Sequence, residues 1–423
     1  MQIDSIRVDG GVCLQGKVKI HGSKNACLPV MAATLLTKGE SRISNCPRIS
    51  DVFRMKQLLG SMGCVIRESS KGITIDTSLM KRKKMPTEAV QGMRSSICML
   101  GALLGRTGEV YMEYPGGCVI GARPIDMHLM ALEKMGAVFR MEEDMIYGSV
   151  ENGFHGADIE FSKVSVGATE NALLAAVLAK GHTRISGAAK EPEVQALCRY
   201  LVKCGAQISG IGSERLEIDG VETLHGCEMR IPADRIVAGT YLFAVLAAGG
   251  SAWLKEAPCD QMEAVIQVAR RMGAVCQTGE DGLYVQAPER LLPVGSLKTG
   301  VYPDFPTDLQ SAVLVAALRA EGVSVIEETI FENRFHIVEP LQDMGANVKV
   351  LDERRVKVWG PSVLAGKAVE AWELRGGAAM VLAGLMANGV STIKGYQYIM
   401  RGYENIAKDL TELGARVFSV REA

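Results

Sequence analysis

The chain has 423 residues, of which 48% are hydrophobic and 22% charged. This composition fits two or three globular domains and excludes a largely disordered protein. Its 47 basic and 48 acidic residues leave a net charge of −1, which argues against non-specific nucleic-acid binding.

The first residues, the apolar stretches and the cysteines indicate the compartment in which we expect the protein. The first residues carry no secretory signal, and no stretch approaches the roughly 18 apolar residues of a membrane span, so we expect no membrane partner. The 11 cysteines are odd in number and include no Cys-x-x-Cys pair. We therefore expect reduced thiols in the cytoplasm rather than a disulfide framework or a zinc site.

Six similar segments of about 70 residues fill the chain. In each, an Ala/Leu-rich stretch ends in glycine, which predicts a helix with a glycine cap and then a strand. These glycines are Gly39, Gly108, Gly181, Gly250, Gly322 and Gly389. A Met-Gly-Ala-like motif then predicts the end of a second helix, at Gly63, Gly136, Gly205, Gly273, Gly345 and Gly414. Two pseudo-threefold α/β domains of three segments each fit this pattern better than one long array.

Charged residues recur where the first helix of each segment should begin. Counting back from the capping glycines leads to Lys24, Arg94, Gly167, Arg235, Asp308 and Arg375. A helix N-terminus attracts anions, and a basic side chain there opposes the helix dipole. For any one position, a solvated side chain or a helix cap is the simpler explanation. Repetition at one register favours a shared anion-binding site.

Three loops add candidate residues. Cys118 lies in a glycine-flanked loop with Arg123 and Asp126, and a thiol beside a cation can be exposed and reactive. The alternative is a small apolar residue in a turn. Arg334 and Arg401 lie in two further loops, where each could equally be a surface arginine.

Seven motifs, in matching order, resemble a known family over nearly the whole chain. They are GSKNA (22–26), PGGCVIGARPID (115–126), VSVGATEN (164–171), KEPEV (190–194), FPTD (305–308), FENRF (331–335) and RGYE (401–404). The family is that of the UDP-N-acetylglucosamine enolpyruvyl transferases. The resemblance implies an inside-out α/β barrel fold with the active site between two domains, residues 22–231 and residues 1–21 with 232–423.

The resemblance also implies a reaction and its residues. The sugar 3-hydroxyl adds to C2 of phosphoenolpyruvate and phosphate is then eliminated, without metal or cofactor, as the first committed step of peptidoglycan synthesis. Cys118 corresponds to the general acid and Asp308 to the candidate base. The implied phosphoenolpyruvate-binding residues are Lys24, Asn25, Arg123, Arg334, Arg375 and Arg401. Those implied for UDP-N-acetylglucosamine are Arg94, Arg123, Pro124, Ile125, Asp126, Met127, Lys163, Val164, Ser165, Val166, Gly167, Asp308 and Ile330.

Several positions depart from the pattern of this family. Glu373 and Met400 stand where Asp is usual, and Val237 where Glu is usual. Ser50 and Cys98 replace a lysine and an aromatic residue of some members. The acid, the base and the cations are intact, so we expect these changes to affect the rate rather than the identity of the reaction.

Two other functions remain open. Enolpyruvylshikimate-phosphate synthase shares the architecture and the donor, but the Cys118 loop and the motif at 164–171 favour the sugar-nucleotide enzyme. A binding protein that has lost turnover is the other alternative, and the intact set of catalytic-type residues argues against it. Release of phosphate with either acceptor would separate these functions.

Overall fold

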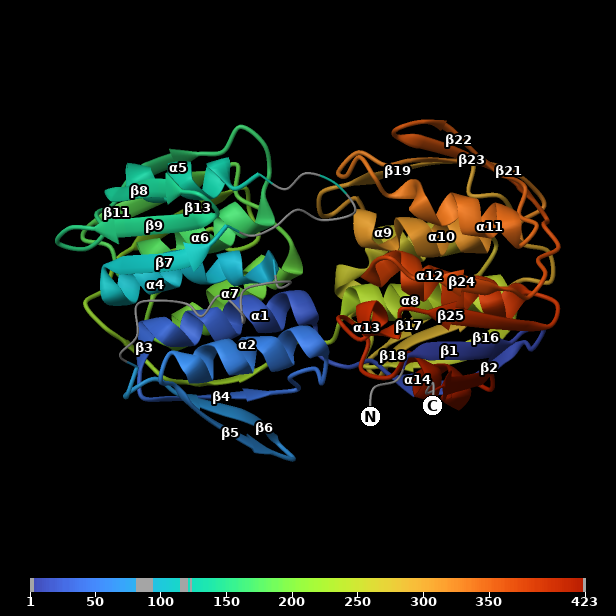
Figure 1. Ribbon diagram of the computed structural model, residues 1–423, viewed down its shortest axis with the longest axis horizontal. Helices are drawn as coiled ribbons and strands as arrows, with labels where there is room; N and C mark the ends of the chain where they lie inside the picture. The colour runs from blue at the N-terminus through green and yellow to red at the C-terminus, as the bar shows by residue number, and fades with distance from the viewer. Residues whose placement is uncertain (1–3, 81–93, 115–120, 122–123, 421–423) are drawn as a thin grey trace. The chain divides into compact units, whose positions relative to one another are not determined.

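The structure is a computed structural model that describes residues 4–80, 94–114, 121 and 124–420 (Figure 1). The described chain divides into two compact units, each with its own hydrophobic core. Of the described residues, the N-terminal unit contains 22–80, 94–114 and 124–232, and the C-terminal unit contains 4–21, 121 and 233–420. The backbone passes between the units after His21 and again after Pro232.

Three helices that are apolar on nearly every side form the centre of each unit. In the N-terminal unit, α4 contacts both α1 and α6, and in the C-terminal unit α8, α10 and α12 all contact one another. A helix without a polar face is stable only when it is buried on all sides, which is why these six lie inside. Their bounds are Lys24–Ala33 (α1), Met99–Thr107 (α4), Val166–Ala176 (α6), Arg235–Ala248 (α8), Gln310–Ala317 (α10) and Leu374–Met386 (α12).

A second set of helices carries the Met-Gly-Ala-like motifs, and each ends two residues before the predicted glycine. Gly345, for example, has φ 103°, and the following Ala346 N–H donates to Leu341 O over 2.9 Å. This left-handed turn is the one that glycine adopts most readily after a helix, so the predicted ends of these helices are confirmed. The helices are Ser50–Ser61 (α2), Asp126–Lys134 (α5), Pro192–Lys203 (α7), Glu263–Arg271 (α9), Val338–Asp343 (α11) and Ile406–Glu412 (α14).

The ends predicted for the central helices were right for α4 and α8. Gly108 caps α4 with φ 71°, and Gly250, with φ 94°, lies two residues after the end of α8. The other four glycines lie further beyond the helix end, at or just before the next strand. After α1 the chain forms a 3₁₀ turn, η1 (Thr34–Leu36), in which Thr34 and Thr37 hydroxyls donate to nearby carbonyl groups. These local bonds end the helix before Gly39 is reached.

In the described residues, the strands form six sheets of three to five strands and one two-stranded ribbon. In spatial order, the N-terminal unit has β15 (Glu228–Arg230), β4 (Glu40–Ser44), β6 (Gly72–Asp76) and β5 (Val65–Ser69). It also has β7 (Glu109–Glu113), β9 (Met145–Val150) and β8 (Ala137–Glu142), then β10 (Asp158–Glu160), β11 (His182–Ser186), β13 (Arg215–Asp219) and β12 (Gln207–Ser209). The ribbon pairs β14 (Leu224–His225) with β3 (Thr37–Lys38).

The C-terminal unit takes two of its strands from the N-terminus. One sheet is β24 (Ala368–Glu370), β25 (Val390–Lys394), β1 (Ser5–Asp9) and β26 (Arg416–Val420), and another is β17 (Val275–Gly279), β18 (Gly282–Gln286), β16 (Gly250–Lys255) and β2 (Leu14–Lys19). The third is β20 (Phe305–Pro306), β19 (Ser296–Gly300), β21 (Gly322–Glu327), β23 (Arg355–Gly360) and β22 (Val348–Asp352). Figure 1 shows β1 and β2, in blue, among the orange and red elements.

The register of β1 shows why it belongs to the C-terminal unit. Ile6 lies opposite Ile393 of β25, and Ile6 and Val8 are fully buried while Arg7 between them is exposed. Alternation of this kind places one face of the strand on the core.

No helix among the described residues is long and apolar enough to cross a membrane.

Candidate functional site

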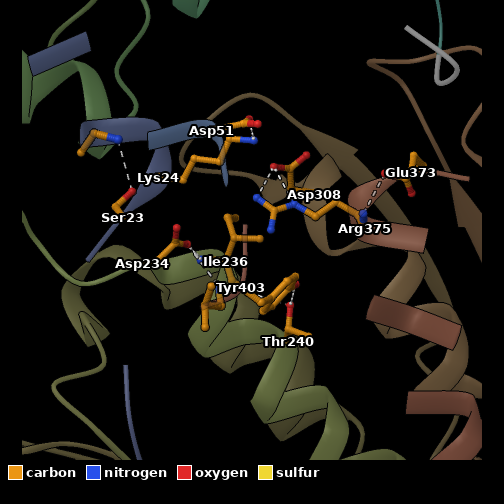
Figure 2. A network of polar contacts seen from close by, with 12 residues as sticks. Ser23, Lys24, Asp51, Asp234, Ile236, Thr240, Asp308, Glu373, Arg375 and Tyr403 are labelled. Carbon is orange, nitrogen blue, oxygen red and sulfur yellow. Dashed lines mark hydrogen bonds and ion pairs between the residues drawn. The ribbon is translucent and has the colours of Figure 1, made fainter. Parts of the chain in front are cut away.

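Lys24 begins α1 and is held there by a buried carboxylate. Its ammonium Nζ lies 2.6 Å from Asp51 Oδ2 in the first turn of α2, and Asp51 is fully buried (Figure 2). Ser23 caps the helix, since its hydroxyl accepts from the Ala26 N–H over 3.3 Å. Asp51 thus balances the unfavourable placement of a cation at a helix start. Asn25 follows Lys24 and is half-buried.

The residues assigned to the sugar nucleotide lie largely at two helix starts of the N-terminal unit. Ser165 caps α6 by accepting from the Ala168 N–H over 3.3 Å, which places Val166 and Gly167 in the first turn. Lys163 and Val164 precede the cap and are exposed. At the start of α5, Asp126 and Met127 are in the first turn, after the exposed Pro124 and the buried Ile125.

A single amide side chain joins these segments. Asn171 of α6 accepts from the Gly101 N–H of α4 over 2.7 Å and donates to Ile97 O over 2.9 Å. Its nitrogen also lies 2.8 Å from Nδ1 of His128 on α5. The 3₁₀ helix η2 (Arg94–Cys98), which Arg94 begins, is therefore brought beside α5 and α6. Neither Asn171 nor His128 was predicted as a site residue.

Close packing explains the glycine at position 167. A Cβ atom added to Gly167 would lie 2.8 Å from Cε1 of His128, which is closer than side chains tolerate. Glycine therefore lets α6 approach α5 at the point where the two assigned segments begin. The motif at residues 164–171 is explained by this contact and by the Ser165 cap.

Asp308 of the C-terminal unit is held between two buried arginines (Figure 2). Its Oδ1 accepts from Arg334 Nη2 over 2.7 Å, and its Oδ2 accepts from Arg375 Nη2 over 3.0 Å and from Arg375 Nε over 3.2 Å. The arginine side chains are 1% and 5% exposed, while that of Asp308 is 26% exposed. The structure thus brings three predicted residues together, with the carboxylate still accessible.

The helix-cap explanation for Asp308 is wrong. No side chain caps the 3₁₀ helix η4 (Thr307–Leu309) that carries Asp308, nor α10 that follows it. Asp308 instead forms ion pairs with Arg334 and Arg375.

Arg375 is oriented at its backbone as well as at its side chain. Glu373 caps α12 by accepting from the Arg375 N–H over 2.7 Å and from the Gly376 N–H. Glutamate at this position therefore serves as the helix cap. Burial by itself lowers the pKa of Arg375, but Asp308, Tyr403 and Asp234 raise it, and the net shift is upward. This guanidinium stays charged at every relevant pH.

Glu328, a residue that the sequence analysis missed, supports the loop that carries Ile330 and Arg334. It is fully buried, and its Oε1 accepts from the N–H groups of Ile330 over 2.8 Å and Phe331 over 3.1 Å. Its Oε2 accepts from the Thr307 hydroxyl over 2.9 Å, beside Asp308. One buried carboxylate therefore fixes the Arg334 loop relative to η4.

Some N–H groups of the two arginines are buried without a partner. These are Nε and Nη1 of Arg334 and Nη1 of Arg375. A buried donor without an acceptor costs about 1–3 kcal/mol, or more when it is charged, and an anion bound beside Asp308 would remove that cost. The arrangement can therefore bind an anion next to a carboxylate able to accept a proton.

The remaining predicted residues are not joined to this cluster by the contacts above. Arg401 is half-buried in the turn after α13 (Tyr396–Ile399). Cys118 and Arg123 lie outside the described residues, and so does the side chain of Arg94. Within the described ranges, no three His, Cys, Asp or Glu side chains are grouped to hold a metal ion.

Comparisons with known proteins agree on one family. The family model for EPSP synthase (3-phosphoshikimate 1-carboxyvinyltransferase) matches residues 8–410. UDP-N-acetylglucosamine 1-carboxyvinyltransferase 2 of Caldanaerobacter subterraneus subsp. tengcongensis is 41% identical over 98% of this chain and 99% of its own length. The UDP-N-acetylglucosamine 1-carboxyvinyltransferase of Acinetobacter baylyi is 40% identical over 98% of this chain and 99% of its own length.

Solved structures show the same fold at lower identity. The enolpyruvyl transferase NikO from Streptomyces tendae superposes with a TM-score of 0.88 at 23% identity, over 98% of each chain. EPSP synthase from Acinetobacter baumannii superposes with a TM-score of 0.76 at 18% identity, over 98% of this chain and 99% of its own. The described structure is thus a mixed α/β protein of the enolpyruvyl transferase fold.

Proposed function

Because this chain belongs to the UDP-N-acetylglucosamine 1-carboxyvinyltransferase family, we propose that it transfers the enolpyruvyl group of phosphoenolpyruvate to the 3-hydroxyl of UDP-N-acetylglucosamine. Phosphate is released, and the product enters peptidoglycan synthesis in the cytoplasm. The observation that carries this proposal is the Asp308 carboxylate between Arg334 and Arg375, whose remaining N–H groups are buried without a partner.

In the addition step, Asp308 accepts the proton of the sugar 3-hydroxyl while the oxygen bonds to C2 of phosphoenolpyruvate. Cys118 gives its proton to the methylene carbon, which becomes a methyl group. In the elimination step, that methyl group returns a proton to the Cys118 thiolate, the C2–C3 double bond forms again, and the C2–O bond to phosphate breaks with its electron pair leaving on the phosphate. Acid and base groups held in place accelerate such transfers by about 10²–10⁴-fold each.

The cations have an electrostatic role in this proposal. Arg334 and Arg375 offer unpartnered N–H groups to the donor substrate, and Lys24, Arg123 and Arg401 complete its binding with Asn25. Charge-assisted hydrogen bonds of this kind are the strong ones for carboxylate and phosphate groups. Held in a site that excludes water, they stabilise the charge on the departing phosphate.

The sugar nucleotide would bind along the helix starts that Asn171 and His128 hold side by side. Arg94, Lys163 and the segments 124–127 and 164–167 supply the contacts, together with Ile330 and Arg123. The free N–H groups at a helix start suit a diphosphate. Asp308 belongs to both substrate sites, since it must reach the hydroxyl that reacts.

We propose the finer architecture on the same basis. The domains are residues 22–231 and residues 1–21 with 232–423, each an inside-out barrel of three repeats around its central helices. Two observations support this: α8, α10 and α12 contact one another, and sheets of similar strand order recur along the chain.

The test is phosphate release by the purified protein with each candidate acceptor. We expect release from phosphoenolpyruvate with UDP-N-acetylglucosamine and none with shikimate 3-phosphate, and we expect a chelator to leave the rate unchanged. Release with shikimate 3-phosphate alone would assign the other enolpyruvyl transferase activity. Binding of the sugar nucleotide without any release would indicate a binding protein.

A further inference from the structure

Tyr403 of the RGYE motif lies beside Arg375 inside the C-terminal unit and has no part in the mechanism above. Its side chain is 1% exposed, and Arg375 Cζ lies 5.8 Å from the centre of its ring. That distance is within the range at which an aromatic ring attracts a guanidinium group. Figure 2 shows the ring between Thr240 of α8 and the cluster around Asp308.

The tyrosine hydroxyl is anchored in one direction. The Tyr403 and Thr240 hydroxyl oxygens are 2.8 Å apart, and Thr240 donates its only hydroxyl proton to Ile236 O over 2.8 Å. Thr240 must therefore accept from Tyr403. Burial raises the pKa of Tyr403 while Arg375 and Thr240 lower it, and the net shift is upward, so the hydroxyl keeps the proton that it donates.

The Arg375 guanidinium group is thus surrounded by a carboxylate, an aromatic ring and a segment of backbone. Asp308 binds Nε and Nη2, the Tyr403 ring lies alongside, and a Cβ atom added to Gly402 would be in ordinary van der Waals contact with Nη1, 3.4 Å away. Nη1 is nevertheless buried without a hydrogen-bond partner. Its orientation therefore depends on the groups that hold the rest of the guanidinium.

We propose that Tyr403 is a positioning residue: anchored by Thr240, its ring keeps Arg375 oriented so that Nη1 meets the anionic donor substrate. The proposal rests on the function proposed above and adds that α8, which carries no catalytic residue in that mechanism, governs affinity for phosphoenolpyruvate. Its effect should appear in the constants for phosphoenolpyruvate and not in those for the sugar nucleotide.

The test compares Tyr403→Phe, Thr240→Val and the double variant with the wild type. Each single change breaks the same hydrogen bond, so each should raise the KM and the calorimetric Kd of phosphoenolpyruvate by about three- to tenfold. The double variant should be no worse than the single ones, because only one bond is lost. Thr240→Ser keeps the hydroxyl and should restore wild-type constants, while the KM of UDP-N-acetylglucosamine stays within about twofold throughout.

Tyr241→Phe is the matched control. Tyr241 is also buried on α8, and its hydroxyl donates to Asp409 Oδ2 over 2.5 Å. Its loss should lower the melting temperature without changing the phosphoenolpyruvate constants. Unchanged constants in Tyr403→Phe and Thr240→Val, or an equal change in Tyr241→Phe, would overturn the role of Tyr403.

The outcomes for the two proposals are distinct. A wild-type protein that binds phosphoenolpyruvate but releases no phosphate would overturn the proposed function, and the comparison of Kd values would still decide the role of Tyr403. A wild-type protein that binds no phosphoenolpyruvate would overturn both proposals.

Discussion

Asp308 accepts hydrogen bonds from two buried guanidinium groups, so its carboxylate is oriented before any substrate arrives. Asp308→Asn keeps the shape but cannot accept the hydroxyl proton, and we expect turnover to fall by about 10²–10⁴-fold. The exposed Asp304, in the preceding turn, is the control, since Asp304→Asn makes the same change of charge. Steady-state rates measure the effect, and equal activity of the two variants would remove Asp308 from the mechanism.

Stability gives a second result for the same variant. Loss of the counter-charge leaves Arg334 and Arg375 buried without a carboxylate, and breaking a buried ion pair in this way costs about 3–5 kcal/mol. Thermal melting of Asp308→Asn should therefore begin at a lower temperature than that of Asp304→Asn. A variant with normal turnover and a lowered melting temperature would show a purely structural role for Asp308.

Cys118 is proposed to donate a proton rather than to form an obligatory covalent bond. Cys118→Asp should keep measurable turnover with a lower pH optimum, because the carboxylic acid must be protonated to act. Cys118→Ser should be far less active, since a hydroxyl is a much weaker acid. Rates measured across pH test both expectations, and an inactive Asp variant beside an active Ser variant would contradict them.

The same thiol should be the target of the epoxide fosfomycin. We expect alkylation of Cys118 to be faster with UDP-N-acetylglucosamine bound, and we expect the Cys118→Asp variant to resist. Peptide mass spectrometry identifies the modified residue among the 11 cysteines. Inactivation with another cysteine labelled and Cys118 unmodified would exclude this role.

At the scale of the helices, α6 carries a buried carboxyl group that makes stability depend on pH. Burial, together with Glu193 and Glu191, raises the pKa of Glu170 from 4.5 to about 8. Between these two values the folded chain holds a proton that the unfolded chain has lost. Stability therefore falls as pH rises through this window, by up to about 1.4 kcal/mol for each pH unit.

Glu170→Gln should remove this dependence, because the amide is neutral at every pH. We expect the variant to melt at a higher temperature than the wild type at pH 8.5 and to differ little at pH 5. Glu160→Gln, at the exposed end of β10, is the control for loss of one carboxylate. If melting curves of Glu170→Gln and wild type move in parallel with pH, Glu170 is not the titrating group.

The helices also show which features local sequence determines. The second set of helices ends where the Met-Gly-Ala-like motifs predict, because a left-handed glycine turn needs only neighbouring residues. Helix α1 ends before Gly39 because the Thr34 and Thr37 side chains, in and after η1, form local bonds that a search for glycines overlooks. The starts of the central helices were predicted well, since Lys24 and Arg235 are the first residues of α1 and α8.

Contacts between distant residues could not be predicted from spacing. Asp308 meets Arg334 from 26 positions away and Arg375 from 67, and Thr240 meets Tyr403 from 163. The motifs therefore named three residues of the Asp308 cluster but not its geometry. They left out Glu328 beside this cluster and, in the other unit, Asp51 beside Lys24. Both are buried carboxylates whose partners become apparent only in the fold.

At the scale of the whole molecule, the chain forms two units with separate cores. Its first two strands, β1 and β2, belong to the C-terminal unit, where they pair with β25 and β16. Composition and repeat length indicated six α/β segments, but pairing of β1 with β25 and β26 spans almost the entire sequence. Only the resemblance to a family suggested that the N-terminal residues belong to the second domain. The proposed reaction likewise needs residues from both units, Lys24 from one and Asp308 from the other.

Direct analysis of the product tests the central claim. The protein is incubated with phosphoenolpyruvate and UDP-N-acetylglucosamine. The molecular mass of the sugar nucleotide is then determined by mass spectrometry, and phosphate is measured in the same sample. We predict an enolpyruvyl ether of the sugar nucleotide formed in equal amount to the phosphate released, with neither product in Asp308→Asn above about 1% of the wild-type rate. Phosphate released without a matching gain in mass of the sugar nucleotide would contradict the account.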